Sequence, residues 1–179
     1  MTARTPRRSP RRTPQPSRPA RAPARPRKDS RAPIDIAWDG VRRRVTDERV
    51  REAARAARRH GRRTDLALSI VFVTDKALAR MHGRHLADPS PTDVITFDLG
   101  DDIDGALGEL YVSADRARIV ARRRKVALRR ELLLYVVHGV LHLCGFDDSR
   151  PSDRARMRTA ESTVLKRLGF VPDQLPHDE

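Results

Sequence analysis

The strongest constraint on the fold is an apolar segment between Leu128 and Cys144, with the sequence LRRELLLYVVHGVLHLC. It is longer than an ordinary strand and contains no proline, which predicts a helix. A helix that is apolar around most of its surface must be buried by other elements on several sides. Its longest purely apolar run, 132–137, is far shorter than the roughly 20 residues that cross a bilayer. The segment therefore predicts the central helix of a globular core.

The positive charge of the chain is concentrated at its N-terminus. The 179 residues have a formal net charge of +14, and residues 1–33 contain ten Arg and one Lys against one Asp. The same segment holds eight of the 13 prolines and no Val, Ile, Leu or aromatic residue. This composition predicts a disordered tail, which either contacts polyanions or has no specific partner. A sequence pI of about 11.4 is thus no argument that the folded part binds nucleic acid.

The remaining residues, 34–179, have the size of a single domain. Cys144 is the only cysteine, so no intrachain disulfide can form. No apolar segment follows the arginine pairs of the tail, which argues against a secretory or twin-arginine signal, and the prolines disfavour the helix of a mitochondrial presequence. We therefore expect a cytoplasmic protein with no membrane partner.

Hydrophobic periodicity and capping residues predict an α+β fold for residues 34–179. Alternating or β-branched segments predict strands, and longer amphipathic or apolar segments predict helices. The expected strands cover 34–38, 66–73, 94–97 and 107–112, and the expected helices cover about 46–60, 77–83, 113–125, 128–144 and 153–168. Between them, 89–91 predicts a loop and 100–105 an acidic turn. The pattern is typical of a single mixed β-sheet of about four strands packed by about five helices.

The predicted central helix ends in the motif HGVLHLCGFDD, from His138 to Asp148. His138 and His142 are four residues apart and share one helix face, so both imidazoles can bind one metal ion. Gly145 is placed to end the helix, since glycine adopts a left-handed conformation at little cost. The chain can then turn back and bring Asp147 or Asp148 to the same ion. Two imidazoles and a carboxylate with an open fourth position are typical of catalytic zinc, which activates a water molecule for hydrolysis.

Two other interpretations of this motif remain open. The spacing H-x3-H-x2-G also resembles the metal motif of metzincin peptidases, but those have a general-base Glu after the first His, where this chain has Gly139. A small residue there would instead allow close packing of the helix. Paired histidines on an apolar helix can also be hydrogen-bonded core residues, and aspartates after a glycine are common in turns.

Three segments in order make the sequence similar to the YbeY family of bacterial metal-dependent endoribonucleases. His138–Asp148 agrees at ten of eleven positions with the family pattern H-G-x-L-H-L-x-G-[YF]-D-H. Pro91–Phe97 (PTDVITF) and Gly108–Ser113 (GELYVS) match two further family segments. The resemblance covers most of residues 34–170 and does not extend to the N-terminal tail.

The resemblance implies a hydrolase that cuts single-stranded RNA in ribosomal RNA maturation and ribosome quality control, with one zinc ion and the ribosomal subunit as partner. It implies metal ligands at His138, His142 and Asp148, and Met157 and Glu161 also fit the family. The family usually has a His where this chain has Asp148. Asp binds zinc at about 2.0–2.2 Å, so a site remains possible with a harder ligand set and a shifted metal preference.

A functional arginine that many family members carry before the PTDVITF segment is harder to assign. An ungapped alignment puts Leu86 at its position, with Arg84 two residues away. Arg84 is the candidate if the loop shifts, and an exposed arginine at a helix end is the alternative. The basic run Arg122–Lys125 either lines an RNA groove or forms a solvated helix face. The altered ligand and the uncertain arginine motivate a second hypothesis, a non-catalytic factor that binds RNA or the ribosome.

Overall fold

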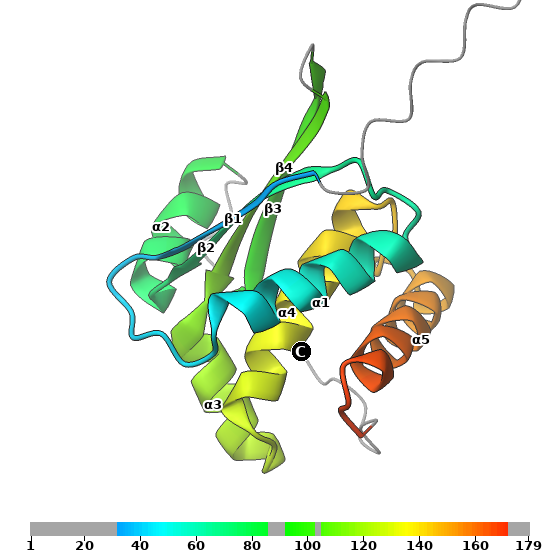
Figure 1. Ribbon diagram of the computed structural model, residues 1–179. Coiled ribbons are helices and arrows are strands. Elements are labelled where there is room, and N and C mark those ends of the chain that lie inside the picture. Colours follow the sequence, from blue (N-terminus) through cyan, green and yellow to red (C-terminus); the bar gives the residue numbers. More distant parts are fainter. Residues whose placement is uncertain (1–31, 86–91, 103–104, 172–179) are drawn as a thin grey trace, which may run out of the picture.

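The computed structural model describes residues 32–85, 92–102 and 105–171. Within these ranges the chain forms one sheet and a set of helices around it (Figure 1). In chain order the elements are β1 (Ile34–Trp38), α1 (Asp47–His60), β2 (Ala67–Val73), α2 (Asp75–His85), β3 (Val94–Asp102), β4 (Gly105–Ser113), α3 (Ala114–Arg124), α4 (Leu128–Leu143) and α5 (Pro151–Arg167). The expected α+β fold with four strands and five helices is confirmed.

Two of the predictions concern parts of the chain that the structure does not describe. The Arg/Pro-rich tail lies almost entirely outside the described residues, and so does the predicted loop at 89–91. Both stay predictions. None of the helices in the described ranges combines the length and apolarity that crossing a bilayer requires.

The sheet is mixed and has the strand order β1-β2-β4-β3. β2 is parallel to both β1 and β4, and β3 is antiparallel to β4. Successive side chains of a strand point to opposite faces, so Tyr111 packs toward α2, whereas Leu110 and Val112 pack into the larger core with α4. Helices therefore cover both faces, with α2 on one side and α1, α3 and α4 on the other (Figure 1).

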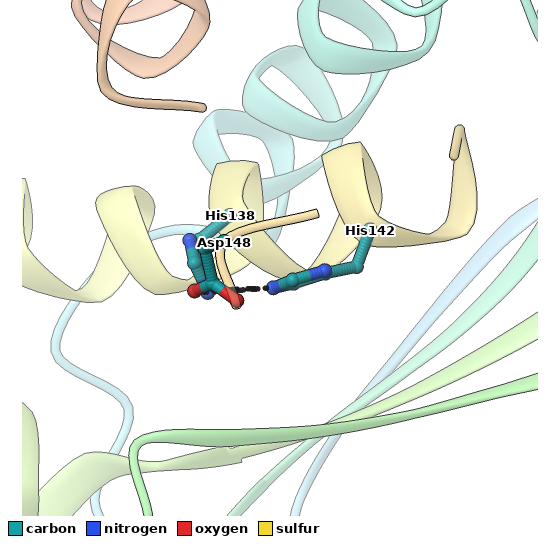
Figure 2. Close-up of side chains that lie close together, drawn as sticks. All are labelled: His138, His142 and Asp148. Atoms are coloured by element: carbon teal, nitrogen blue, oxygen red, sulfur yellow. Dashed lines mark hydrogen bonds and ion pairs between the residues drawn. The ribbon is translucent and has the colours of Figure 1, made fainter. Parts of the chain in front are cut away.

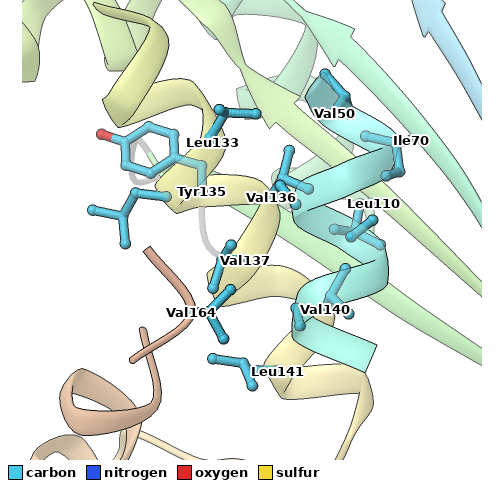
Figure 3. Close-up of a cluster of buried hydrophobic side chains, with 14 of the residues drawn as sticks. Val50, Ile70, Leu110, Leu133, Tyr135, Val136, Val137, Val140, Leu141 and Val164 are labelled. Atoms are coloured by element: carbon cyan, nitrogen blue, oxygen red, sulfur yellow. The ribbon is translucent and has the colours of Figure 1, made fainter. Parts of the chain in front are cut away.

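α4 is the centre of the larger core. It contacts α1, α3, α5, β3 and β4, and the cluster around it is drawn in Figure 3. From Arg130 to Leu143 every residue is buried except His138 and His142. Fully burying one Val or Leu side chain contributes roughly 1.5–3 kcal/mol relative to leaving it exposed. The predicted central helix is thus confirmed, and its only partly exposed positions in this stretch are the two histidines.

The β3–β4 hairpin is longer than the sequence suggested. The sequence predicts an acidic turn over 100–105, but β3 continues to Asp102 and pairs there with Gly105. Gly100 has a φ of +79°, and the pairing register shifts between Asp98 and Asp101. A glycine in this conformation accommodates a bulge inside a strand, so the strand continues past the residues that resembled a turn.

Candidate metal centre

His138 and His142 project from the same side of α4, one helical turn apart (Figure 2). Their side chains are 18% and 26% exposed. The rings meet edge to face with centroids 4.4 Å apart, and their Nε2 atoms are 2.9 Å apart. The spacing of four residues has thus brought one nitrogen from each imidazole to the same point.

The other nitrogen of each ring has an acceptor of its own. Glu161 Oε1 on α5 lies 2.6 Å from His138 Nδ1, and the Phe146 carbonyl oxygen lies 3.0 Å from His142 Nδ1. A carbonyl oxygen only accepts, so His142 carries its proton on Nδ1, and the Glu161 carboxylate favours the same tautomer of His138. In their neutral forms, both rings therefore present an Nε2 lone pair to the same point. Histidines that bind metal ions almost always have their second N–H held in this way.

Asp148 adds a carboxylate oxygen to the two imidazole nitrogens. Its Oδ2 lies 3.5 Å from His138 Nε2 and 3.7 Å from His142 Nε2, and the three candidate ligand atoms all lie within 4.8 Å of one another. All three atoms offer electron pairs, and two nitrogens with one oxygen suit zinc and related divalent ions. The residues that the sequence singled out are therefore together in space, in an arrangement that fits a metal ion.

The surroundings shift the pKa values of the two histidines in opposite directions. Burial lowers the pKa of His138, but the hydrogen bond and negative charge of Glu161 outweigh burial and leave this pKa above its ordinary value. Burial and the neighbouring His138 hold the pKa of His142 below its ordinary value. A carboxylate on Nδ1 also makes the opposite ring nitrogen more basic, which strengthens His138 as a ligand.

Two other polar residues of the motif lie outside this cluster. Asp147 accepts hydrogen bonds from the Ser149 hydroxyl and from the backbone N–H groups of Ser149 and Asp148, and these bonds hold its pKa below the ordinary value. Burial raises the pKa of Cys144 to about 11, so its thiol stays protonated at neutral pH. Of the two aspartates considered from the sequence, Asp148 is the one in the cluster, and Asp147 orders its loop.

Gly139 lies where α4 packs closely against the sheet. A Cβ atom at this position would be 2.8 Å from Leu110 Cδ2, 3.1 Å from Val94 Cγ2 and 3.2 Å from Thr96 Cγ2. These separations are below the optimum of about 3.5–4.0 Å for carbon atoms. A glutamate, which metzincin peptidases need at this place, has no room. The tight contact explains the glycine and argues against peptidase chemistry.

The cluster opens into a cavity of about 600 Å³. Arginines from two helices line it, namely Arg116, Arg123 and Arg124 of α3 and Arg154 and Arg158 of α5, together with the carboxylates of Asp93, Glu131, Asp148 and Glu161. Arg124 forms a buried ion pair with Glu131 at 3.6 Å, so the other arginines supply most of the accessible positive charge. Two residues of the predicted basic run therefore border the same cavity as the histidines. Positive charge around an opening of this kind attracts anions and holds them near the cluster.

The sequence motifs did not identify Arg154 as part of this site, and they left the role of Arg84 open. Arg154 was not singled out, although its Nη1 donates a hydrogen bond to the Asp148 carbonyl at 3.1 Å. Its position, six residues after Asp148 at the start of the next helix, is the only signal in the sequence. Arg84, the arginine considered from the resemblance, lies near the end of α2, but its side chain is outside the described residues. The role considered for Arg84 stays a prediction.

Replacing Glu161 tests whether it orients His138. Glu161→Ala is expected to weaken zinc binding by about 10–100-fold, the usual effect of losing the partner of a ligand histidine. Glu161→Gln should lose less, because its amide oxygen still accepts from Nδ1. A competition titration with a coloured chelator measures the affinity, and Glu48→Ala on α1, whose side chain is 70% exposed, is the control. Equal affinity in Glu161→Ala and the unchanged protein would contradict this role.

Comparisons with known proteins agree on one family. A family model described as endoribonuclease YbeY matches residues 38–169. An endoribonuclease YbeY of Myxococcus xanthus is 35% identical over 116 residues, which are 62% of this chain and 40% of that protein. An endoribonuclease YbeY of Chloroherpeton thalassium is 32% identical over 130 residues, which are 72% of this chain and 90% of that protein. The chain thus spans less than half of the first relative and most of the second.

A solved structure resembles the fold as well. The solution structure of a Thermotoga maritima protein covers 82% of this chain and 99% of its own, with 22% sequence identity and a TM-score of 0.52. At this level of identity the match concerns the fold alone.

Proposed function

The chain belongs to the YbeY endoribonuclease family, and from this premise we propose that it is a metal-dependent endoribonuclease that cuts single-stranded RNA. The observation that carries the proposal is the convergence of His138 Nε2, His142 Nε2 and Asp148 Oδ2 within 4.8 Å of one another. These atoms border a cavity that also has arginines from α3 and α5 in its lining. A metal site beside cationic side chains suits a phosphodiester substrate.

In this proposal His138, His142 and Asp148 hold one divalent ion, for which zinc is the first choice. When bound, the ion would activate a water molecule and offset negative charge on the phosphate. Glu161 and the Phe146 carbonyl keep the two imidazoles in the tautomer that leaves Nε2 free to bind. Glu161 and the Phe146 carbonyl thus orient the two imidazoles from the side opposite the atoms that would hold the ion.

The arginines provide the binding of the RNA backbone. Those of α3 and α5 border the cavity from two helices, so a strand passing the cluster would meet positive charge from both. Phosphate contacts of this kind supply affinity without reading the base sequence. We assign the activity to ribosomal RNA maturation and ribosome quality control in the cytoplasm on the strength of the family, not of the net charge of the chain.

Cleavage of an end-labelled single-stranded RNA by the full-length protein, beside His142→Ala, tests the proposal. We expect the unchanged protein to cut, a chelator to stop it, and added zinc to restore it. His142→Ala should cut at least about 100-fold more slowly, because loss of a ligand exceeds the loss of an orienting partner. Thermal unfolding checks that the variant is folded. Equal cleavage by both proteins would contradict the metal-dependent reaction.

Asp148, in place of the family's usual histidine, favours a second candidate, a non-catalytic factor that binds RNA or the ribosome. A carboxylate lowers the charge of the site, and a metal ion there would then hold the α4–α5 loop without promoting hydrolysis. The same assay separates the two candidates. Tight RNA binding without cleavage, in protein shown to contain its metal, would support the binding factor.

A further inference from the structure

Arg154 of α5 is bonded directly to the backbone of Asp148. Its Nη1 donates a hydrogen bond to the Asp148 carbonyl oxygen at 3.1 Å. The Asp147 carboxylate accepts from the Asp148 backbone N–H at 2.7 Å. The backbone of Asp148 is therefore held on both sides of its Cα by charged side chains. This limits where the Asp148 carboxylate can lie relative to His138 and His142.

Arg154 also borders the cavity that contains the three candidate ligands. The residue is half-buried, and no carboxylate within the described ranges forms an ion pair with it. A guanidinium carries several N–H donors in a planar fork, and the Asp148 carbonyl engages only one of its nitrogen atoms. The remaining donors are available to an anion that enters the cavity.

Arg156 of α5 does not share this combination of contacts. Arg156 lies two residues further along and has a side chain that is 74% exposed. It pairs with Asp153 at 3.5 Å and does not line the cavity. Arg156 carries the same charge on the same helix without touching the cluster, which makes it a matched control for Arg154.

We propose that Arg154 has two roles at this site: it positions Asp148 for metal binding, and it binds the phosphate group of the RNA at the cluster. The inference rests on the proposed function. A guanidinium can donate two parallel hydrogen bonds to phosphate oxygens, and its contribution grows as negative charge develops on them during hydrolysis. Arg154 thus supplies the site with a guanidinium from α5. The functional arginine that the resemblance implies would instead come from the segment before PTDVITF, where this chain has Arg84 and Leu86.

Two variants separate the two roles. Arg154→Ala removes both, so we expect zinc affinity about tenfold weaker and single-turnover cleavage about 100-fold slower at saturating zinc and RNA. Arg154→Lys can still donate to the Asp148 carbonyl, but a lysine ammonium lacks the planar fork. It should recover most of the zinc affinity while cleavage stays slow. Arg156→Ala should match the unchanged protein in both measurements.

Zinc affinity is measured on the full chain without RNA, so this readout does not depend on catalysis. Unchanged zinc affinity and cleavage rate in Arg154→Ala would overturn the inference. Full recovery of the cleavage rate in Arg154→Lys would overturn the phosphate role. Equal losses of zinc affinity and cleavage rate in Arg156→Ala would show that both effects come only from the loss of a positive charge on α5. If the unchanged protein binds zinc but cuts no RNA, the proposed function fails, whereas weaker zinc binding by Arg154→Ala would still support the positioning of Asp148.

Discussion

Protein purified without a metal-affinity step is expected to contain about one zinc ion per chain, and His138→Ala is expected to contain almost none. The substitution removes a ligand whose opposite nitrogen is held by Glu161 at 2.6 Å, so the remaining histidine and Asp148 are left as an incomplete pair. Because a metal ion contributes several kcal/mol to the hydrolysis of a phosphodiester, cleavage should fall by roughly a thousandfold. Elemental analysis and the RNA assay measure the two effects on the same samples.

The two neighbouring aspartates provide the control for this experiment. Asp148→Ala should lose metal as His138→Ala does. Asp147→Asn should retain the metal, because its amide oxygen can still accept from the Asp148 backbone N–H. Asp148→His should retain or tighten metal binding, since an imidazole replaces the carboxylate. Absence of any transition metal in the unchanged protein, with thermal unfolding that a chelator does not affect, would remove Asp148 as a ligand.

Substitution of Gly139 is expected to lower the stability of the protein. Gly139→Ala places a Cβ atom 2.8 Å from Leu110 Cδ2 and close to Val94 and Thr96. Overpacking of this kind costs about 1–3 kcal/mol in the free energy of unfolding. Gly139→Glu must in addition bury a carboxylate against apolar side chains, which costs several kcal/mol more or prevents folding. Urea denaturation followed by circular dichroism measures both variants.

Gly83 is the matched control for this prediction. It also lies in a helix, α2, but a Cβ atom there would meet nothing within 4 Å. Gly83→Ala should be neutral or stabilising by up to about 1 kcal/mol, because alanine favours a helix over glycine. A Gly139→Ala protein as stable as Gly83→Ala would show that α4 can move away from the sheet, and would remove the steric argument against a glutamate at position 139.

Local sequence patterns predicted most of the helices and strands, and the three predicted ligand residues lie close together in the structure. The apolar run of α4 requires burial on several sides whatever the rest of the chain does. A spacing of four residues brings His138 and His142 to one helix face, and Gly145, which has a φ of +88°, lets the chain turn back immediately after α4. These features depend on neighbouring residues along the chain, so periodicity and backbone preference are enough to predict them.

Contacts between distant segments could not be predicted from local sequence patterns in this way. Glu161 lies 23 residues from His138 along the chain, and the atoms that confine Gly139 belong to β3 and β4. The continuation of β3 past Gly100 depends on pairing with β4, which outweighs the local preference of glycine and aspartate for a turn. Long-range packing decides such features, and one sequence without its partners in space carries little signal for them.

The sequence by itself therefore determined the buried central helix, the two histidines on one of its faces and the turn that follows. Only the tertiary structure decided that Glu161 contacts His138, that side chains of β3 and β4 confine Gly139, and that Arg154 holds the Asp148 backbone. The physical reason is that helical spacing is set within one turn of the backbone. The position of a carboxylate or guanidinium from α5 depends instead on how that helix packs against α1 and α4.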